Sequence, residues 1–299
     1  MDKNLLVSVV VVAYNAENTI LETLESVKSQ SYMNIELIVS DDCSKDKTVM
    51  LCKEWIVNNK ERFNSVCLLT AEHNQGVCRN FNKAISRVKG EWIKIIAADD
   101  LLLPDCVKDF VDYTSRNSEA DFITSVQKVY RNSFAEENCI NPNCIEKSHV
   151  FDKDSSAQLK IMAYHNFVSA PTIFFRKKLF EEVGGFDVRY PYEDHPFYIS
   201  ILEAGHKIYL LNKPTVCYRL HESFSNSKAK IFNYNFLLDS KKFLKERCFK
   251  YYKFNQRYAV NAYYLLLYLF EKYGLNRQKR FNILLFKILR HAIYLIGKF

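Results

Sequence analysis

The segment "VSVVVVA" at 7–13 decides the fold class of this chain, because it is continuously apolar and rich in β-branched residues. A run of this kind is typical of a strand that is buried on both faces of a parallel sheet. Further strand-like segments follow at 35–40 ("IELIVS"), 66–70 ("VCLLT") and 92–98 ("WIKIIAA"), and helical patterns lie between them. This alternation predicts an α/β fold with a doubly wound, mixed but mainly parallel sheet and flanking helices.

The second half of the chain continues this pattern and then changes. A strand is predicted at 122–130, and two short strands, "KIYLL" and "TVCYRL", are expected after Gly205. Beyond residue 227 the pattern is helical throughout, with no alternation of the strand type. We therefore expect a sheet domain at 1–227 and a helical extension at 228–299.

Charge is divided unevenly between these two parts. The extension carries 16 Lys/Arg and 3 Asp/Glu, a net charge of +13, whereas the preceding 227 residues carry 26 basic and 31 acidic residues, a net charge of −5. A neutral-to-acidic body with a strongly basic tail favours a negatively charged surface as a partner. The chain has no recognised nucleic-acid-reading motif, so we expect no nucleic-acid partner.

Composition indicates a folded protein of the cytosol. Hydrophobic residues make up 48% of the chain and charged residues 25%. The nine cysteines are scattered without a CxxC pair, mostly in apolar runs, which predicts reduced, buried thiols; a zinc site using Cys139 and Cys144 is the alternative. No stretch reaches the ~20 apolar residues of a spanning helix, and the N-terminal apolar run reads as a strand rather than a signal peptide.

Polar residues collect where the predicted strands end. Ligands of open α/β sheets bind outside the carboxyl ends of the strands. Here, these ends carry Tyr14-Asn15, Asp41-Asp42, His73-Asn74 and Asp99-Asp100. The sequence therefore predicts a ligand site at this edge of the sheet.

The distribution of glycine narrows the chemistry of that site. None of the seven glycines lies in the first 75 residues, so the chain has neither a GxGxxG dinucleotide-binding turn nor a Walker loop at its start. If the site binds a nucleotide, another cation must offset the phosphates, and Mg²⁺ or Mn²⁺ held by Asp99 and Asp100 would do so. The alternative is that this pair caps the helix that starts at Pro104, where acidic residues favour the positive end of the helix dipole.

Six segments form an ordered set between about residues 7 and 225. They are "VSVVVVAYNAENTILETLESVKSQSYMNIELIVSDDCSKDKT", "NQGVCRNFNKAI", "GEWIKIIAADD", "GGFD", "YEDHPF" and "YRLHESFS". Together they resemble the family 2 glycosyltransferases, which are nucleotide-sugar-dependent inverting enzymes with the GT-A fold. The resemblance implies a nucleotide-binding half at 1–103 and an acceptor half at 104–227.

The resemblance assigns residues to the nucleotide. It implies that Ala13, Tyr14 and Asn15 line the nucleotide pocket and that Asp42 hydrogen-bonds the base. The expected base is uracil, whose N–H suits a carboxylate acceptor. Arg79 resembles the family arginine that contacts the base or the diphosphate. The alternatives are a turn or helix cap for Asp42 and a surface ion pair for Arg79.

The resemblance also implies a metal site for Mn²⁺ or Mg²⁺. Asp100 would contact the metal, with Asp99 directed toward the ribose or the metal, and His221 would be a third ligand of the metal or the diphosphate; a surface histidine is the alternative for His221. Two positions depart from the family pattern. Ala97 stands where relatives often have a further Asp, which leaves one carboxylate fewer, and Cys43 stands where Gly is more frequent, which predicts a tighter or shifted loop.

Asp194 would be the general base. Inverting transfer needs a carboxylate that takes the proton of the acceptor hydroxyl as it attacks the anomeric carbon. The alternative, which is compatible with this role, is that Glu193 and Asp194 cap a helix. On the acceptor side, the resemblance places Pro171 and Thr172 together with Asp187 and Glu193.

We expect an inverting glycosyltransferase that uses a nucleotide-sugar, with UDP as the expected nucleotide, and extends a bacterial surface polysaccharide. Its acceptor would be a hydroxyl of a saccharide, and a polyprenyl-diphosphate-linked saccharide would suit this role. The basic segment 228–299 would hold the enzyme on the anionic inner face of the plasma membrane; a packed helical subdomain or a homodimer interface is the alternative. A different class of function, a catalytically silent sugar-nucleotide-binding or scaffold protein, is the alternative to an enzyme.

Overall fold

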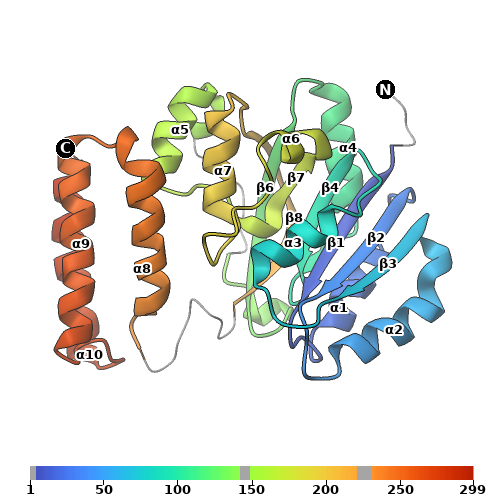
Figure 1. Ribbon diagram of the computed structural model, residues 1–299, viewed down its shortest axis with the longest axis horizontal. Helices are drawn as coiled ribbons and strands as arrows, with labels where there is room; N and C mark the ends of the chain where they lie inside the picture. The colour runs from blue at the N-terminus through green and yellow to red at the C-terminus, as the bar shows by residue number, and fades with distance from the viewer. Residues whose placement is uncertain (1–4, 142–148, 221–229, 299) are drawn as a thin grey trace. The chain divides into compact units, whose positions relative to one another are not determined.

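The computed structural model describes residues 5–141, 149–220 and 230–298 (Figure 1). The chain divides into two compact units, Met1–Leu159 with Phe167–Leu220, and Lys160–Asn166 with His221–Phe299. Each unit is described by itself below. The predicted domain boundary near residue 227 and the expected ligand His221 lie outside the described residues.

An eight-stranded sheet is the core of the first unit. Its strands are β1 (Val7–Ala13), β2 (Ile35–Asp41), β3 (Ser65–Thr70), β4 (Trp92–Ala97), β5 (Leu101–Leu102), β6 (Phe122–Arg131), β7 (Ile173–Arg176) and β8 (Tyr209–Leu220). Their order across the sheet is β3-β2-β1-β4-β7-β6-β8-β5. The pairs β3–β2, β2–β1, β1–β4 and β6–β8 are parallel, and β7 and β5 pair antiparallel with their neighbours. The predicted α/β fold with a mixed, mainly parallel sheet is confirmed.

Helices cover both faces of this sheet (Figure 1). On one face, α1 (Ile20–Lys28), α2 (Thr48–Asn59) and α4 (Cys106–Arg116) pack against the apolar side chains of β1 and β2. On the other face lie α3 (Val77–Ile85), α6 (Lys177–Glu182) and α7 (Asp194–Glu203). Adjacent β7 residues show the two sides: Phe174 stacks on Phe110 of α4, while Phe175 contacts Phe180 of α6. Every residue of β1 and β2 is buried, as expected for strands covered on both faces.

Two strands differ from the prediction. The segment after Gly205 forms the single strand β8, which pairs with β6 along its length. The pairing is irregular between Ser125 and Gln127 of β6, where its register shifts. The two-residue strand β5, which pairs with Val216 and Cys217 of β8, has no apolar alternation that could reveal it. Both features bring β8 beside the segment that follows Asp100.

The described part of the second unit is helical, as predicted. It contains α8 (Tyr234–Phe243), a π-helical turn at Leu244–Cys248, a 3-10 turn at Phe249–Tyr251, α9 (Phe254–Lys272) and α10 (Arg280–Lys298). The residues 160–166 of α5 (Ser155–Tyr164) and its following segment belong to the same unit. Leu267 and Phe270 of α9 pack with Phe286 of α10 in a separate apolar core. Among the described helices, none combines the length and apolarity needed to cross a membrane.

The cysteines of the described residues are unpaired thiols, and five of them are buried. Cys139 lies next to Tyr130 in an isolated β-bridge. Its predicted zinc partner Cys144 lies outside the described residues.

Candidate active site

Asn15 joins two loops at the carboxyl edge of the sheet. Its backbone N–H donates to Ser44 Oγ at 2.8 Å, and its Oδ1 accepts from the Lys45 N–H at 2.8 Å, so the β1–α1 and β2–α2 loops are held together. Its φ of 49° is a left-handed conformation that Asn tolerates better than most residues. Ala13 is buried at the end of β1, whereas the Tyr14 and Asn15 side chains are exposed. The structure thus brings the three predicted nucleotide-pocket residues to the expected edge.

Cys43 keeps a backbone conformation of the glycine type. Its φ is 67°, in the left-handed region that glycine adopts without steric cost. Its thiol contacts Lys45 Nζ at 3.0 Å and the Glu72 carbonyl at 3.2 Å. The departure from glycine at this position therefore adds a side chain to the loop without removing the positive φ.

The Asp42 carboxylate binds the backbone directly before α3. Its carboxylate, 3% exposed, accepts hydrogen bonds from the backbone N–H groups of Gln75 (3.0 Å to Oδ1) and Gly76 (2.8 Å to Oδ2). Arg79, in the first turn of α3, is exposed and donates to the Gln75 carbonyl at 3.4 Å. It forms no ion pair with the residues that the structure describes. The structure thus places Asp42 and Arg79 at the start of the same helix, where the Asp42 carboxylate takes up the N–H groups that a helix N-terminus offers to anions.

Asp100 is held by a neighbouring strand rather than by a helix. Its Oδ1 accepts from the backbone N–H of Arg219 at 2.8 Å, and its carbonyl accepts from Thr23 Oγ1 at 2.8 Å. The helix α4 begins at Cys106, with Asp105 at its N-cap position. The alternative that Asp100 caps this helix is therefore wrong, because its carboxylate bonds to β8.

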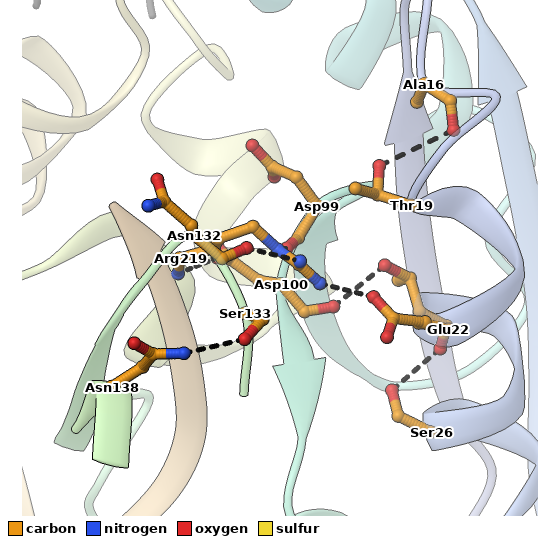
Figure 2. A network of polar contacts seen from close by, with 11 residues as sticks. Ala16, Thr19, Glu22, Ser26, Asp99, Asp100, Asn132, Ser133, Asn138 and Arg219 are labelled. Carbon is orange, nitrogen blue, oxygen red and sulfur yellow. Dashed lines mark hydrogen bonds and ion pairs between the residues drawn. The ribbon is translucent and has the colours of Figure 1, made fainter. Parts of the chain in front are cut away.

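The Arg219 guanidinium joins the segments around the Asp pair (Figure 2). Its Nε donates to the Asp99 carbonyl at 2.9 Å and its Nη1 to the Asn132 carbonyl at 2.8 Å, while its Nη2 pairs with the Glu22 carboxylate of α1. The guanidinium also lies over the Phe134 ring, 4.2 Å from its centre. Arg219 is 9% exposed, so the guanidinium is largely shielded from water, whereas the Glu22 side chain is exposed.

The electrostatics of the Asp pair favour a cation. Burial, together with the adjacent Asp99 carboxylate, raises the pKa of Asp100 well above its usual range. The buried ammonium of Lys94 partly opposes this rise; it donates to the carbonyls of Ile95 and Pro171, and burial lowers its own pKa to about 8. Two like charges held this close are stabilised when a divalent ion or another cation comes near.

The residues present fit a phosphate-bound divalent ion rather than a protein-caged one. Within the described ranges, no group of three or more His, Cys, Asp or Glu side chains could hold a metal. Mg²⁺ and Mn²⁺ are commonly held by one or two carboxylates together with substrate phosphates. Asp99 and Asp100 provide that number of carboxylates, and Ala97 provides none.

A second acidic pair begins α7. Glu193 is the N-cap residue and Asp194 the first helical residue, and both are half-buried. The Glu193 side chain makes no capping hydrogen bond, so only the position, and not the contact, matches the helix-cap alternative. Burial and the neighbouring Asp194 carboxylate raise the pKa of Glu193 to about 7.

Tyr218 links the two acidic pairs. The pKa of this β8 tyrosine is raised by burial and then by the fields of four carboxylates, those of Asp100, Asp99, Asp194 and Glu193. The four carboxylates therefore act on the same phenol. Asp99 and Asp100 follow the carboxyl end of β4, where ligands of this sheet type are bound, and Glu193 and Asp194 begin α7.

The predicted acceptor-side residues lie in different environments. Pro171 and Thr172 are buried, and the Thr172 hydroxyl bonds Thr124 Oγ1 at 2.7 Å. Asp187 accepts from the backbone and guanidinium of Arg189, at 2.6 Å for the closest pair of atoms. Thr172 is therefore part of the buried interior, and the Asp187 carboxylate forms an ion pair with Arg189.

Sequence reasoning missed three residues of this site. Arg219, Lys94 and Tyr218 were not predicted to belong to it, although Arg219 and Tyr218 lie in the quoted "YRLHESFS" segment and Lys94 in "GEWIKIIAADD". A lysine in an otherwise apolar strand, and a Tyr-Arg pair directly after a run of strand residues, were the available signals.

A match to a family model identifies the chain. Residues 8–184, more than half of the sequence, match the model described as Glycosyl transferase family 2. The chain belongs to this family. It is therefore a glycosyltransferase, and the resemblance seen in the six ordered segments is confirmed.

Curated relatives match over most of their length. An uncharacterized glycosyltransferase of Haemophilus influenzae is 28% identical over 251 residues, covering 81% of this chain and 72% of the relative. The Escherichia coli protein WfaP, named UDP-Glc:alpha-D-GlcNAc-diphosphoundecaprenol beta-1,3-glucosyltransferase, is 26% identical over 229 residues, covering 75% of this chain and 82% of WfaP. The putative glycosyltransferase EpsE of Bacillus subtilis is 26% identical over 232 residues, covering 77% of each chain.

Solved structures confirm the fold of the family. The S. aureus TarS 1-349 complex with UDP-GlcNAc is similar with a TM-score of 0.59 and 18% identity, covering 97% of this chain and 81% of that one. The Pyrobaculum calidifontis mannosyltransferase PcManGT, in complex with GDP-Man and Mn²⁺, has a TM-score of 0.53 and 19% identity, covering 72% and 56%. In a further TarS structure, the matched region is 36% of the TarS chain. At these identities, the similarity shows the fold and no more.

Proposed function

We propose that this chain transfers a sugar, with inversion, from a nucleotide-sugar to a hydroxyl of a saccharide acceptor. The observation that carries the proposal is the Asp99-Asp100 pair that Arg219 holds at the carboxyl end of β4, together with a second acidic pair, Glu193-Asp194, at the start of α7. Inverting transfer needs these two functions side by side: a site for the diphosphate that leaves and a carboxylate that takes the proton of the attacking hydroxyl. The half 1–103 would bind the nucleotide, and the half 104–227 the acceptor.

The donor half of the proposal uses the carboxyl ends of β1, β2 and β4. Tyr14 and Asn15 would border the nucleotide, and Asp42 would hydrogen-bond its base. The exposed Arg79, at the start of α3, would contact the base or the diphosphate. Asp99 and Asp100 would hold Mn²⁺ or Mg²⁺, which supplies positive charge to offset the leaving diphosphate. Arg219 would keep this pair in position through the Asp100 carboxylate and the Asp99 carbonyl.

The acceptor half of the proposal depends on Asp194. Its carboxylate would accept the proton of the acceptor hydroxyl while the hydroxyl oxygen bonds to the anomeric carbon and the bond from that carbon to the diphosphate breaks. The diphosphate is a good leaving group that needs no proton, so one base is sufficient. Glu193, whose pKa is raised to about 7, is in part protonated near neutral pH and suits a supporting role.

The names of relatives favour particular substrates. UDP-GlcNAc is bound by TarS and UDP-Glc is named for WfaP, which favours a UDP-linked donor here. Because PcManGT binds GDP-Man, GDP-linked sugars should be compared with UDP-linked sugars as donors. WfaP is also named for a diphosphoundecaprenol acceptor. We extend the proposal to a polyprenyl-diphosphate-linked acceptor of surface-polysaccharide synthesis, reached at the anionic inner face of the plasma membrane.

Replacement of the base tests the proposal. We expect Asp194→Asn to reduce turnover of the best UDP-sugar and acceptor by about 1,000-fold or more, because general-base catalysis contributes roughly 10²–10⁴-fold, while the affinity for UDP stays within about twofold. The matched control is Asp112→Asn on α4, which removes an exposed carboxylate paired with Lys108 and should leave turnover unchanged. UDP binding without transfer to any acceptor by the wild type would favour the silent sugar-nucleotide-binding alternative.

A further inference from the structure

Exposed apolar side chains concentrate on two helices of the second unit. The large hydrophobic residues of α10 that are exposed are Phe281, Leu284, Ile288, Leu289, Tyr294, Leu295 and Ile296. Those of α9 are Phe254, Tyr258, Leu265, Tyr268 and Leu269. Soluble proteins rarely leave an apolar surface of this extent uncovered unless it binds something.

Four of the exposed residues of α10 form one continuous stripe. Phe281, Leu284, Ile288 and Leu295 recur at spacings of three, four and seven residues, which places them on the same side of a helix. Their exposed fractions are 70% for Phe281, 59% for Leu284 and 57% for Ile288. The opposite side, with Phe286, packs on α9. This stripe is thus not required for the internal packing of the helix pair.

Unpaired positive charge borders the stripe. The segment 272–299 contains seven Lys/Arg and no Asp or Glu. Arg280 and Lys287 of α10 are exposed, lie seven residues apart and form no ion pair within the described ranges. The neighbouring acid Glu271 is already engaged, at 2.7 Å from Lys230 Nζ. An apolar stripe with basic residues at its border is complementary to a bilayer that carries anionic headgroups, whereas a second copy of this basic segment would repel it.

We infer that the apolar stripe of α10, with its basic border, docks on an anionic lipid bilayer, and that α10 lies in the plane of the headgroups without spanning the membrane. The inference names the surface that brings the enzyme to a lipid-linked acceptor, and in that respect it rests on the proposed function. The docking itself requires no substrate. The stripe would insert its Phe and Leu side chains at the boundary between headgroups and acyl chains, with Arg280 and Lys287 at the phosphates.

Flotation with vesicles tests the inference on the full-length protein. We expect binding to vesicles of phosphatidylcholine and phosphatidylglycerol (3:1), weaker binding at 0.5 M NaCl, and little binding to pure phosphatidylcholine. The double variant Arg280→Gln/Lys287→Gln should bind about 30-fold more weakly. The variant Leu284→Ser/Ile288→Ser should lose binding similarly. Both changes are at exposed positions, and circular dichroism would verify that each variant is folded.

Matched controls come from the first unit, where Met33 (66% exposed) and Val57 (72% exposed) are isolated surface hydrophobics. Met33→Ser/Val57→Ser should bind vesicles like the wild type. Equal binding by all variants, or no binding to anionic vesicles by the wild type, would overturn the inference. So would a dimer in light scattering that Ile288→Ser converts to monomers, because a second copy would then cover the stripe. UDP binding, measured without vesicles, separates failure here from failure of the proposed function.

Discussion

At the scale of single residues, the two adjacent carboxylates at the start of α7 differ in what the fold does to them. Burial and the Asp194 carboxylate raise the pKa of Glu193 to about 7, from an ordinary value of 4.5. The protonated form of Glu193 is therefore favoured by folding. Its contribution to stability is complete below about pH 4.5 and is lost as the pH rises through about 7.

Glu193→Gln tests this titration, because glutamine resembles the protonated acid at every pH. We expect the unfolding free energy of the variant, relative to the wild type, to increase steadily between pH 5 and pH 8. Urea unfolding at four pH values in this range would measure it. Glu181→Gln, at an exposed position in α6, is the control and should show a constant difference. A constant difference for Glu193→Gln as well would mean that the pKa of Glu193 is not raised.

At the scale of elements, Arg219 connects four segments that are distant in the sequence. Its backbone and guanidinium join the end of β8 to Glu22 of α1, to the Asp99-Asp100 segment, and to Asn132 after β6. The planar guanidinium reaches three acceptors in different directions. A lysine keeps the charge but cannot reproduce this geometry.

Arg219→Lys should therefore affect both stability and donor binding. We expect a loss of about 1–3 kcal/mol of unfolding free energy and an affinity for UDP with Mn²⁺ that falls by about tenfold, measured by calorimetry. The matched control is Arg62→Lys, since Arg62 donates to the carbonyls of Lys28, Gln30, Tyr32 and Met33 and lies away from the Asp pair. That variant should lose stability but keep its affinity for UDP. An unchanged UDP affinity in folded Arg219→Lys would show that Arg219 is only structural.

Sequence pattern predicted elements better than it predicted their partners. The strand at 7–13 and the helices beyond residue 230 follow from local periodicity, so they could be identified without the fold. The pairing of β5 with β8 could not, because two residues have no periodicity and their partner lies more than a hundred positions away. The same distance hid the bond between the Arg219 N–H and the Asp100 carboxylate.

At the scale of the whole molecule, the sequence predicted where the candidate site lies better than it predicted which side chains surround the Asp pair. The rule that ligands bind at the carboxyl ends of parallel strands was sufficient to predict that Asn15, Asp42 and Asp100 lie at one edge of the sheet. The burial of Lys94 and the effect of both acidic pairs on the pKa of Tyr218 depend on how β4, α7 and β8 pack together, and no local sequence pattern predicts that packing.

The central claim is that Asp99 and Asp100 form the place where the donor diphosphate is bound together with a divalent cation. The most direct test is calorimetric titration of UDP in the presence of Mn²⁺ into the wild type, Asp100→Asn and Asp105→Asn. Asparagine keeps an oxygen for the Arg219 N–H and removes only the charge, and Asp105, five residues away, is exposed and bonded to Ser31. We predict that UDP affinity falls by about 100-fold in Asp100→Asn, or roughly 2.7 kcal/mol, and is unchanged in Asp105→Asn. Wild-type UDP affinity in a folded Asp100→Asn would contradict the account.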